Sequence, residues 1–131
     1  TKKKVITAFD RYALSEAAEA IISLVDSVNK YVNEKTPWTL AKDESKKIEL
    51  AQVLYNVLEV MRHVSVLISP FTPSIAQAMW EQLSQEGSVE SVLLDELRWG
   101  GLKAGKIASA ETVKPVFLRL DSELAGEKKK K

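Results

Sequence analysis

Trp38 directly follows Pro37 beyond a long amphipathic stretch, and both its type and its position suit binding chemistry. Proline cannot continue a helix, and it also disfavours the helical conformation at the preceding residue, Thr36. The chain must therefore turn at this point and hold a large flat ring at a fixed exit. Such a ring can cap the hydrophobic core, or it can offer a face on which a nucleic-acid base stacks. Composition alone leaves these two interpretations of Trp38 equally open.

The other chemically active residue types are sparse and do not converge. The only histidine, His63, follows Glu59 by four residues, a spacing that suits a pair on the surface of a helix. With no cysteine and no carboxylate cluster beside it, this histidine gives neither a metal site nor a nucleophile–base pair. Gly100 and Gly101 lack the preceding strand, the following helix and the lysine of a phosphate-binding loop, so they predict a turn beyond Trp99. We therefore expect no catalytic residue, no metal and no cofactor in this chain.

Apolar periodicity predicts three helices that position these residues. A stripe with a period near 3.6 starts at about Ser15 and is ended by Pro37. A second helix over 45–69 is apolar on most of its circumference, which is typical of a helix that others surround, and we expect Leu54 to be buried in it. A third helix follows over 73–85, where a proline at the first position costs no hydrogen bond and the preceding threonine suits the N-cap.

The ends of the chain are predicted to add shorter pieces. Residues 5–10 have the pattern of the end of a helix, and residues 115–120 alternate in a way that predicts a short extended segment. The predicted fold class is all-α: a helical bundle with a short irregular or extended C-terminal segment that packs back on it. We expect three parts, namely the end of a truncated first helix with a joint (1–13), the bundle (14–120) and a disordered lysine-rich tail (121–131).

Length and composition restrict the class of protein. A chain of 131 residues with 45% hydrophobic residues fits one globular domain. Its apolar runs are shorter than the roughly 20 residues that span a bilayer, and no targeting segment is visible. The absence of cysteine fits an intracellular compartment. Because the chain opens on Thr1 rather than methionine, we expect it to be a piece of a longer protein.

The net charge of +1 is the sum of two basic chain ends and an acidic remainder, which we call the body. Seven lysines lie in two terminal runs, Lys2–Lys4 and Lys128–Lys131, which are predicted to be solvated, disordered ends. Without these seven, 12 of the 19 basic residues remain against 18 acidic ones, so the body carries a charge near −6. A body of this sign gives no general attraction to phosphate. Any contact with nucleic acid must therefore be made by a local group of residues or by a neighbouring domain.

Six short motifs follow one another from about Leu14 to Arg119, and only their combination is specific. They are Asn29–Val32 with Thr36–Trp38, Leu40–Asp43, Val53–Glu59, Leu67–Pro73, Met79–Leu83 and Trp99–Leu102. In their order and spacing the chain resembles the helical anticodon-binding domain of methionyl-tRNA synthetase, a class I aminoacyl-tRNA synthetase.

The resemblance implies an α-helical bundle that reads the CAU anticodon of methionine tRNA. It implies that Trp38 stacks on an anticodon base and that Pro37 helps to shape the same pocket. Loop bases can be read in this way because they splay out of the RNA helix. Asn29 either offers its amide to a base edge or tethers the helix end to the following loop, and we favour the tether. Lys30 and Lys35 are candidate phosphate contacts, although surface solvation is the commoner role of such lysines.

The resemblance also implies that functional parts of the family are missing from this sequence. The catalytic domain, with its HIGH-type and KMSKS-type motifs, is absent, so ATP and methionine would be used by a parent enzyme and not by this chain. Absent too is the start of the first bundle helix, where family members carry an Asn and, four residues later, an Arg that contact the anticodon. Leu118 stands where the family often has a proline.

The expected partners follow from the same resemblance. They are methionine tRNA and the catalytic domain of the parent synthetase, or another partner that covers the truncated first helix, with no membrane involved. The expected location is cytoplasmic, with an organelle as the other possibility. The alternative function is that of a helical interaction or structural module, derived from this domain, that no longer reads tRNA.

Overall fold

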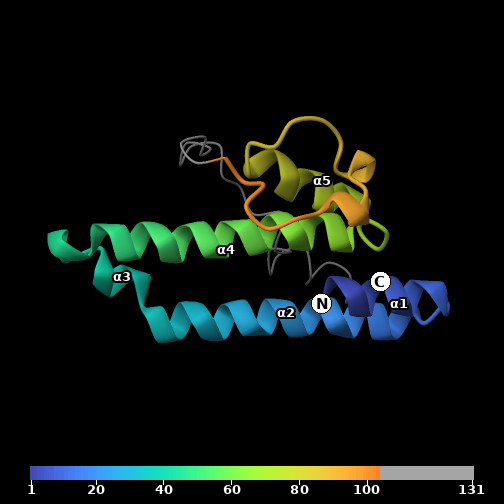
Figure 1. The fold of residues 1–131 in the computed structure, drawn as a ribbon, viewed down its shortest axis with the longest axis horizontal. Helices are drawn as coiled ribbons and strands as arrows, with labels where there is room; N and C mark the ends of the chain where they lie inside the picture. Colours follow the sequence, from blue (N-terminus) through green and yellow to red (C-terminus); the bar gives the residue numbers. More distant parts are fainter. Residues whose placement is uncertain (104–131) are drawn as a thin grey trace, which may run out of the picture.

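The computed structural model describes residues 1–103 (Figure 1). Its elements in chain order are α1 (Lys2–Asp10), α2 (Leu14–Lys35), α3 (Pro37–Leu40), η1 (Glu44–Lys46), α4 (Lys47–Ile68), α5 (Pro73–Gln82), η2 (Val89–Ser91) and η3 (Leu94–Glu96). No strand occurs in this part of the chain, and the predicted all-α class is confirmed. The predicted extended segment 115–120, with Leu118, and the lysine-rich tail 121–131 lie outside the described residues.

Helices α2 and α4 form a long antiparallel hairpin, and α3 with η1 closes one end of it (Figure 1). Helix α1 packs against α2, and α5 packs against α4, both toward the other end of the hairpin. The segment after η3 then runs back along α4 (Figure 1). The end of the hairpin that carries α3 therefore projects beyond the rest of the molecule.

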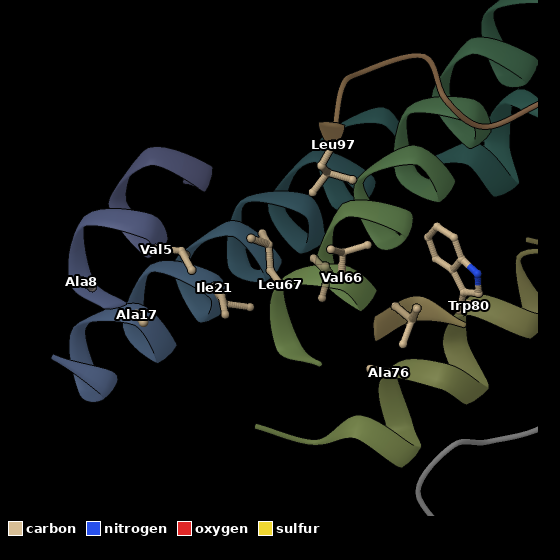
Figure 2. Close-up of a cluster of buried hydrophobic side chains, with 11 residues drawn as sticks. Val5, Ala8, Ala17, Ile21, Val66, Leu67, Ala76, Trp80 and Leu97 are labelled. Carbon is tan, nitrogen blue, oxygen red and sulfur yellow. The ribbon is translucent and has the colours of Figure 1, made fainter. Parts of the chain in front are cut away.

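The hydrophobic core lies where α1, α2, α4 and α5 meet (Figure 2). Its buried members are Val5, Ala8, Ala17, Ile21, Val64, Val66, Leu67, Ala76, Trp80, Val89 and Leu97. Small alanines on α1, α2 and α5 let these helices approach closely, while leucine, valine and tryptophan side chains fill the remaining space. Since the α4 members all fall in its last two turns, the core is concentrated at the end of the hairpin opposite α3.

The prediction that Leu54 is buried is wrong. Its side chain is 45% exposed, although it lies on the helix that was expected to be central. The first half of α4 packs mainly against α2 and α3, because α5 packs farther along (Figure 1). Val53, on the covered side, is only 2% exposed. An apolar helix surface therefore remains open to solvent in the projecting half of the hairpin.

The boundaries of α5 differ slightly from the expectation. Thr72 occupies the N-cap position and Pro73 the first turn, but no side chain caps the helix. Instead the Thr72 hydroxyl donates back to the carbonyl of Ile68, at 3.5 Å. The helix ends at Gln82, three residues earlier than expected, and Ser84 then adopts a left-handed conformation with φ 55°.

The first three lysines belong to α1 and do not form a disordered end, so that part of the tail prediction is wrong. Lys2 Nζ donates a hydrogen bond to the carbonyl of Leu97, at 3.1 Å. This contact ties the start of α1 to the end of η3, 95 residues away in sequence.

Candidate nucleic-acid interface

The exit from α2 is a sharp turn at Thr36. This residue adopts the left-handed conformation, with φ 44° and ψ 62°, and its N–H donates to the carbonyl of Val32 at 2.9 Å. Its own carbonyl accepts from the N–H groups of Thr39 and Leu40, at 2.8 and 3.2 Å. A β-branched residue is disfavoured in this conformation, so the turn is both strained and closely defined by hydrogen bonds. It sets the direction in which the next helix leaves.

Trp38 lies within that next helix, α3, and not outside any helix as expected. Pro37 provides the first position of α3, where its missing N–H leaves no bond unmade. Leu40 anchors the helix as its buried residue, 7% exposed, and α3 packs against α4. The indole of Trp38 is 55% exposed. This exposure excludes the interpretation in which Trp38 caps the hydrophobic core.

Asn29, Lys30 and Lys35 lie on the last two turns of α2, and all three are exposed. Lys30 Nζ is 3.9 Å from Glu34 Oε1, a solvent-exposed pair that contributes little to stability. Within residues 1–103 the Asn29 side chain makes no hydrogen bond, so the tether to the following loop that we favoured is not present there. These three side chains approach the projecting end of the hairpin without being tied down in it.

A second aromatic residue, Trp99, is carried by a loop that a buried carboxylate holds. Glu59 is 0% exposed, and its two carboxylate oxygens accept hydrogen bonds from three successive backbone N–H groups, those of residues 100–102, at 2.8, 3.1 and 3.0 Å. Arg62 donates to the same carboxylate from Nε at 3.0 Å and from Nη2 at 2.8 Å. Nη2 also donates to the carbonyl of Arg98, at 2.7 Å. The loop is thereby fixed on both sides of Trp99.

Glu59 and His63 do pair as predicted, but not at the surface, because the Glu59 carboxylate is sealed under the glycine loop. Burial raises the pKa of Glu59, but the hydrogen bond and charge of Arg62, with the N–H groups of the loop, bring that pKa below its ordinary value. Burial and the charge of Arg62 lower the pKa of His63, which Glu59 opposes only in part. His63 Nε2 lies 3.4 Å from Glu59 Oε1, so at neutral pH the contact involves an uncharged imidazole.

Gly101 is the position at which the loop tolerates no side chain. A Cβ atom there would lie 2.5 Å from Arg62 Nη2 and 2.7 Å from Arg62 Cζ. The guanidinium cannot withdraw without losing its bonds to Glu59 and Arg98. We therefore expect Gly101→Ala to lower the free energy of unfolding by about 1–3 kcal/mol, as overpacking does elsewhere. Urea denaturation of the two proteins measures this, and equal stability would show that the loop lifts away from α4 at little cost.

Other kinds of site find no support in the described part of the chain. No group of three histidine, cysteine, aspartate or glutamate side chains in residues 1–103 is arranged to hold a metal ion. None of the helices in this range combines the length and the apolar character needed to cross a membrane.

The all-helical fold agrees with the family that the chain matches. Residues 1–114 match the family described as the anticodon-binding domain of tRNA ligase. Because this match covers most of the chain, the chain belongs to that family.

The similar full-length proteins narrow the family further. The chain is 39% identical over 127 residues to a methionine–tRNA ligase of Halalkalibacterium halodurans, covering 94% of the chain and 18% of that protein. It is 40% identical over 133 residues to a methionine–tRNA ligase of Caldanaerobacter subterraneus, covering 98% of the chain and 20% of that protein. A chloroplastic/mitochondrial methionine–tRNA ligase of Arabidopsis thaliana is 33% identical over 121 residues, 91% of the chain and 19% of that protein. The resemblance to the anticodon-binding domain of methionyl-tRNA synthetase is confirmed, and the chain spans about a fifth of the length of these relatives.

Proposed function

We propose that this domain binds methionine tRNA and reads its CAU anticodon by stacking an anticodon base on Trp38, so that a parent enzyme attaches methionine to the correct tRNA. The observation that supports this most directly is the 55% exposure of an indole on a short, closely defined helix. A ring that is already held in place loses little conformational freedom when a base stacks on it.

The neighbouring residues have supporting roles in this proposal. Pro37 precedes the indole in α3, and we propose that it helps to shape the pocket that receives the base. Asn29 is free to offer its amide to a base edge, since no other described residue binds it. Lys30 and Lys35 supply local positive charge for phosphates, which matters because the body as a whole is acidic. Specificity for CAU then comes from base edges, and the stacking itself supplies affinity.

The chemistry of aminoacylation belongs to the parent enzyme in this proposal. Relatives of which this chain spans about a fifth are named methionine–tRNA ligases, and we infer that ATP and methionine bind in the remainder of such a protein. The catalytic domain, or another partner, would cover the start of the truncated first helix, since the apolar side of α1 is already buried against the core. A cytoplasmic location is proposed, with an organelle as the alternative, since one relative is named as chloroplastic/mitochondrial.

The test is a titration with an RNA stem-loop that carries the CAU anticodon. Stacking contributes roughly 1–3 kcal/mol per base, so Trp38→Ala should raise the dissociation constant by about 5- to 150-fold. Trp38→Phe should recover part of the loss. The matched control is Tyr12→Ala, which removes a 92% exposed aromatic ring at the joint between α1 and α2, away from α3. We expect the control to bind as tightly as the unchanged protein.

Two results would contradict the proposal. The first is equal affinity for the CAU stem-loop and for one with an altered anticodon. The second is an affinity that Trp38→Ala does not change but that falls steeply with salt, which would mean that only lysine charges are engaged. Either result would favour the alternative of an interaction or structural module that no longer reads tRNA.

A further inference from the structure

We propose that Trp99 is a second stacking surface, which binds another unpaired base of the RNA that is held at Trp38. This inference rests on the proposed function and adds a site to it. Trp99 lies 61 positions after Trp38 in the chain and on a different element. Its exposure and the hydrogen bonds that hold its loop are therefore observations independent of those at Trp38.

The backbone that carries Trp99 is held more rigidly than a surface loop needs to be. Its indole is 57% exposed, yet the backbone on either side is bonded to α4 through Arg98, residues 100–102 and the buried Glu59. The hydroxyl of Tyr55 adds a bond to the carbonyl of Leu102, at 3.0 Å. Every buried side-chain nitrogen and oxygen in residues 1–103 has a partner, so this network is complete. An exposed aromatic ring on such a support is preorganised for binding.

A groove opens beside the indole. It has a volume of about 290 Å³ and runs between the two helices of the hairpin, with Leu24, Val28 and Tyr31 on α2, Asn56 and Val60 on α4, and Trp99 at its edge. Ligand pockets start at about 300 Å³, so this groove has the size for one flat ring system. The ring of His63 packs against Trp99 with 5.9 Å between ring centroids, which limits how far the indole can turn.

The polar atoms of the groove favour a nucleobase over an aliphatic side chain. Asn56 Nδ2 donates to the hydroxyl of Tyr31 at 3.1 Å, and Gln52 in turn donates to Asn56 Oδ1 at 2.9 Å. This chain of bonds leaves the Tyr31 proton without an acceptor in residues 1–103. A base carbonyl or ring nitrogen that lies in the groove would supply that acceptor.

The charges around the loop point to the same occupant. Arg98 and Lys103 flank residues 99–102 and are both exposed, and no acidic side chain lines the groove. The one carboxylate beneath the loop, Glu59, is buried and neutralised by Arg62. Arg98, the exposed cation next to Trp99 in sequence, suits a phosphate that flanks a stacked base.

The groove is close enough to Trp38 for one RNA to reach both. The groove extends along α2 from Leu24 to Tyr31, about 17 Å to about 6 Å before the end of that helix, and α3 follows directly. Trp38 lies on α3 at the end of the hairpin, and Trp99 lies on the loop that is bonded to α4, so one RNA that runs along the hairpin can contact both.

The test compares variants of the 131-residue chain in titrations with the CAU stem-loop. Trp99→Ala should weaken binding by about 5- to 150-fold, and Trp99→Phe should recover most of the affinity. Trp99→Leu keeps an apolar side chain over the groove but has no aromatic face, so it should bind as weakly as the alanine variant. The matched control is Leu93→Ala, which removes a side chain that is 61% exposed and does not line the groove.

The two proposals can fail separately in this experiment. If Trp38→Ala weakens binding while Trp99→Ala and Trp99→Leu stay within twofold of the unchanged protein, the second stacking surface is refuted and the function at Trp38 stands. That is also the result expected if a protein surface occupies the groove. If none of the three changes matters, both proposals are overturned. If Leu93→Ala weakens binding as much as Trp99→Ala, the loss is not specific to the ring and the inference also fails.

Discussion

Replacing Glu59 by alanine is expected to destabilise the fold by about 3–5 kcal/mol, the usual cost of breaking a buried ion pair on one side. The substitution leaves the guanidinium of Arg62, 6% exposed, without its carboxylate, and it removes the acceptor of three backbone N–H groups. Each unmade hydrogen bond in the interior adds to the cost of the unpaired charge. The loop of residues 100–102 would lose its hydrogen bonds to α4, and Arg62, on the next turn of α4, would lose its ion pair.

Urea denaturation of the Glu59→Ala variant measures this, with Glu49→Ala as the matched control. Glu49 lies on the same helix but is exposed, so its removal should change stability by no more than about 0.5 kcal/mol. The pKa of Glu59 is lower in the folded state than its ordinary value of 4.5. Its stabilisation is therefore present above the ordinary pKa and is lost as the pH falls through the folded-state value. A Glu59→Ala protein that keeps the stability of the control would show that the carboxylate is not needed to hold the loop.

The second large effect is expected at Leu67, whose side chain is 2% exposed in the core. Leu67→Ala should cost about 2–5 kcal/mol, through lost burial and the cavity that remains among tightly packed neighbours. Leu54→Ala makes the same chemical change on the same helix, but at a side chain that is 45% exposed, so it should cost less than half as much. Comparing the midpoints of thermal unfolding separates the two variants. Equal losses would mean that the projecting half of the hairpin is covered in solution.

The presence of the helices and the positions of their ends were predictable, because the local sequence determines both. Pro37 and Pro73 mark where one helix must stop or another can begin, and the apolar period near 3.6 identified α2 and α4 to within a few residues. The order of six short motifs was sufficient to indicate the family, which the match over residues 1–114 then showed. These are signals that a single stretch of sequence carries by itself.

The network around Glu59 was not predictable from such local signals. The spacing of Glu59 to His63 indicates a pair on one helix face, but nothing in it reveals that residues 100–102, more than 40 positions later, cover the carboxylate. The burial of Leu54 was wrongly predicted for a related reason. An apolar circumference indicates that neighbours are needed, but where α5 packs along α4 is decided by tertiary contacts. Gly100 and Gly101 were the one available signal, since Gly100 adopts a positive φ and Gly101 leaves room for the Arg62 guanidinium, and both let successive N–H groups turn toward the carboxylate.

The separation between the projecting α3 and the core at the opposite end of the hairpin has an evolutionary consequence. Trp38 and Pro37 do not belong to the core cluster, so substitutions there should cost less folding free energy than substitutions in the core. The residues that recognise RNA can therefore change in evolution, or be redesigned in the laboratory, while selection for a stable fold acts on the core residues at the opposite end of the hairpin. Such modularity would let one scaffold acquire new specificity through single amino-acid changes.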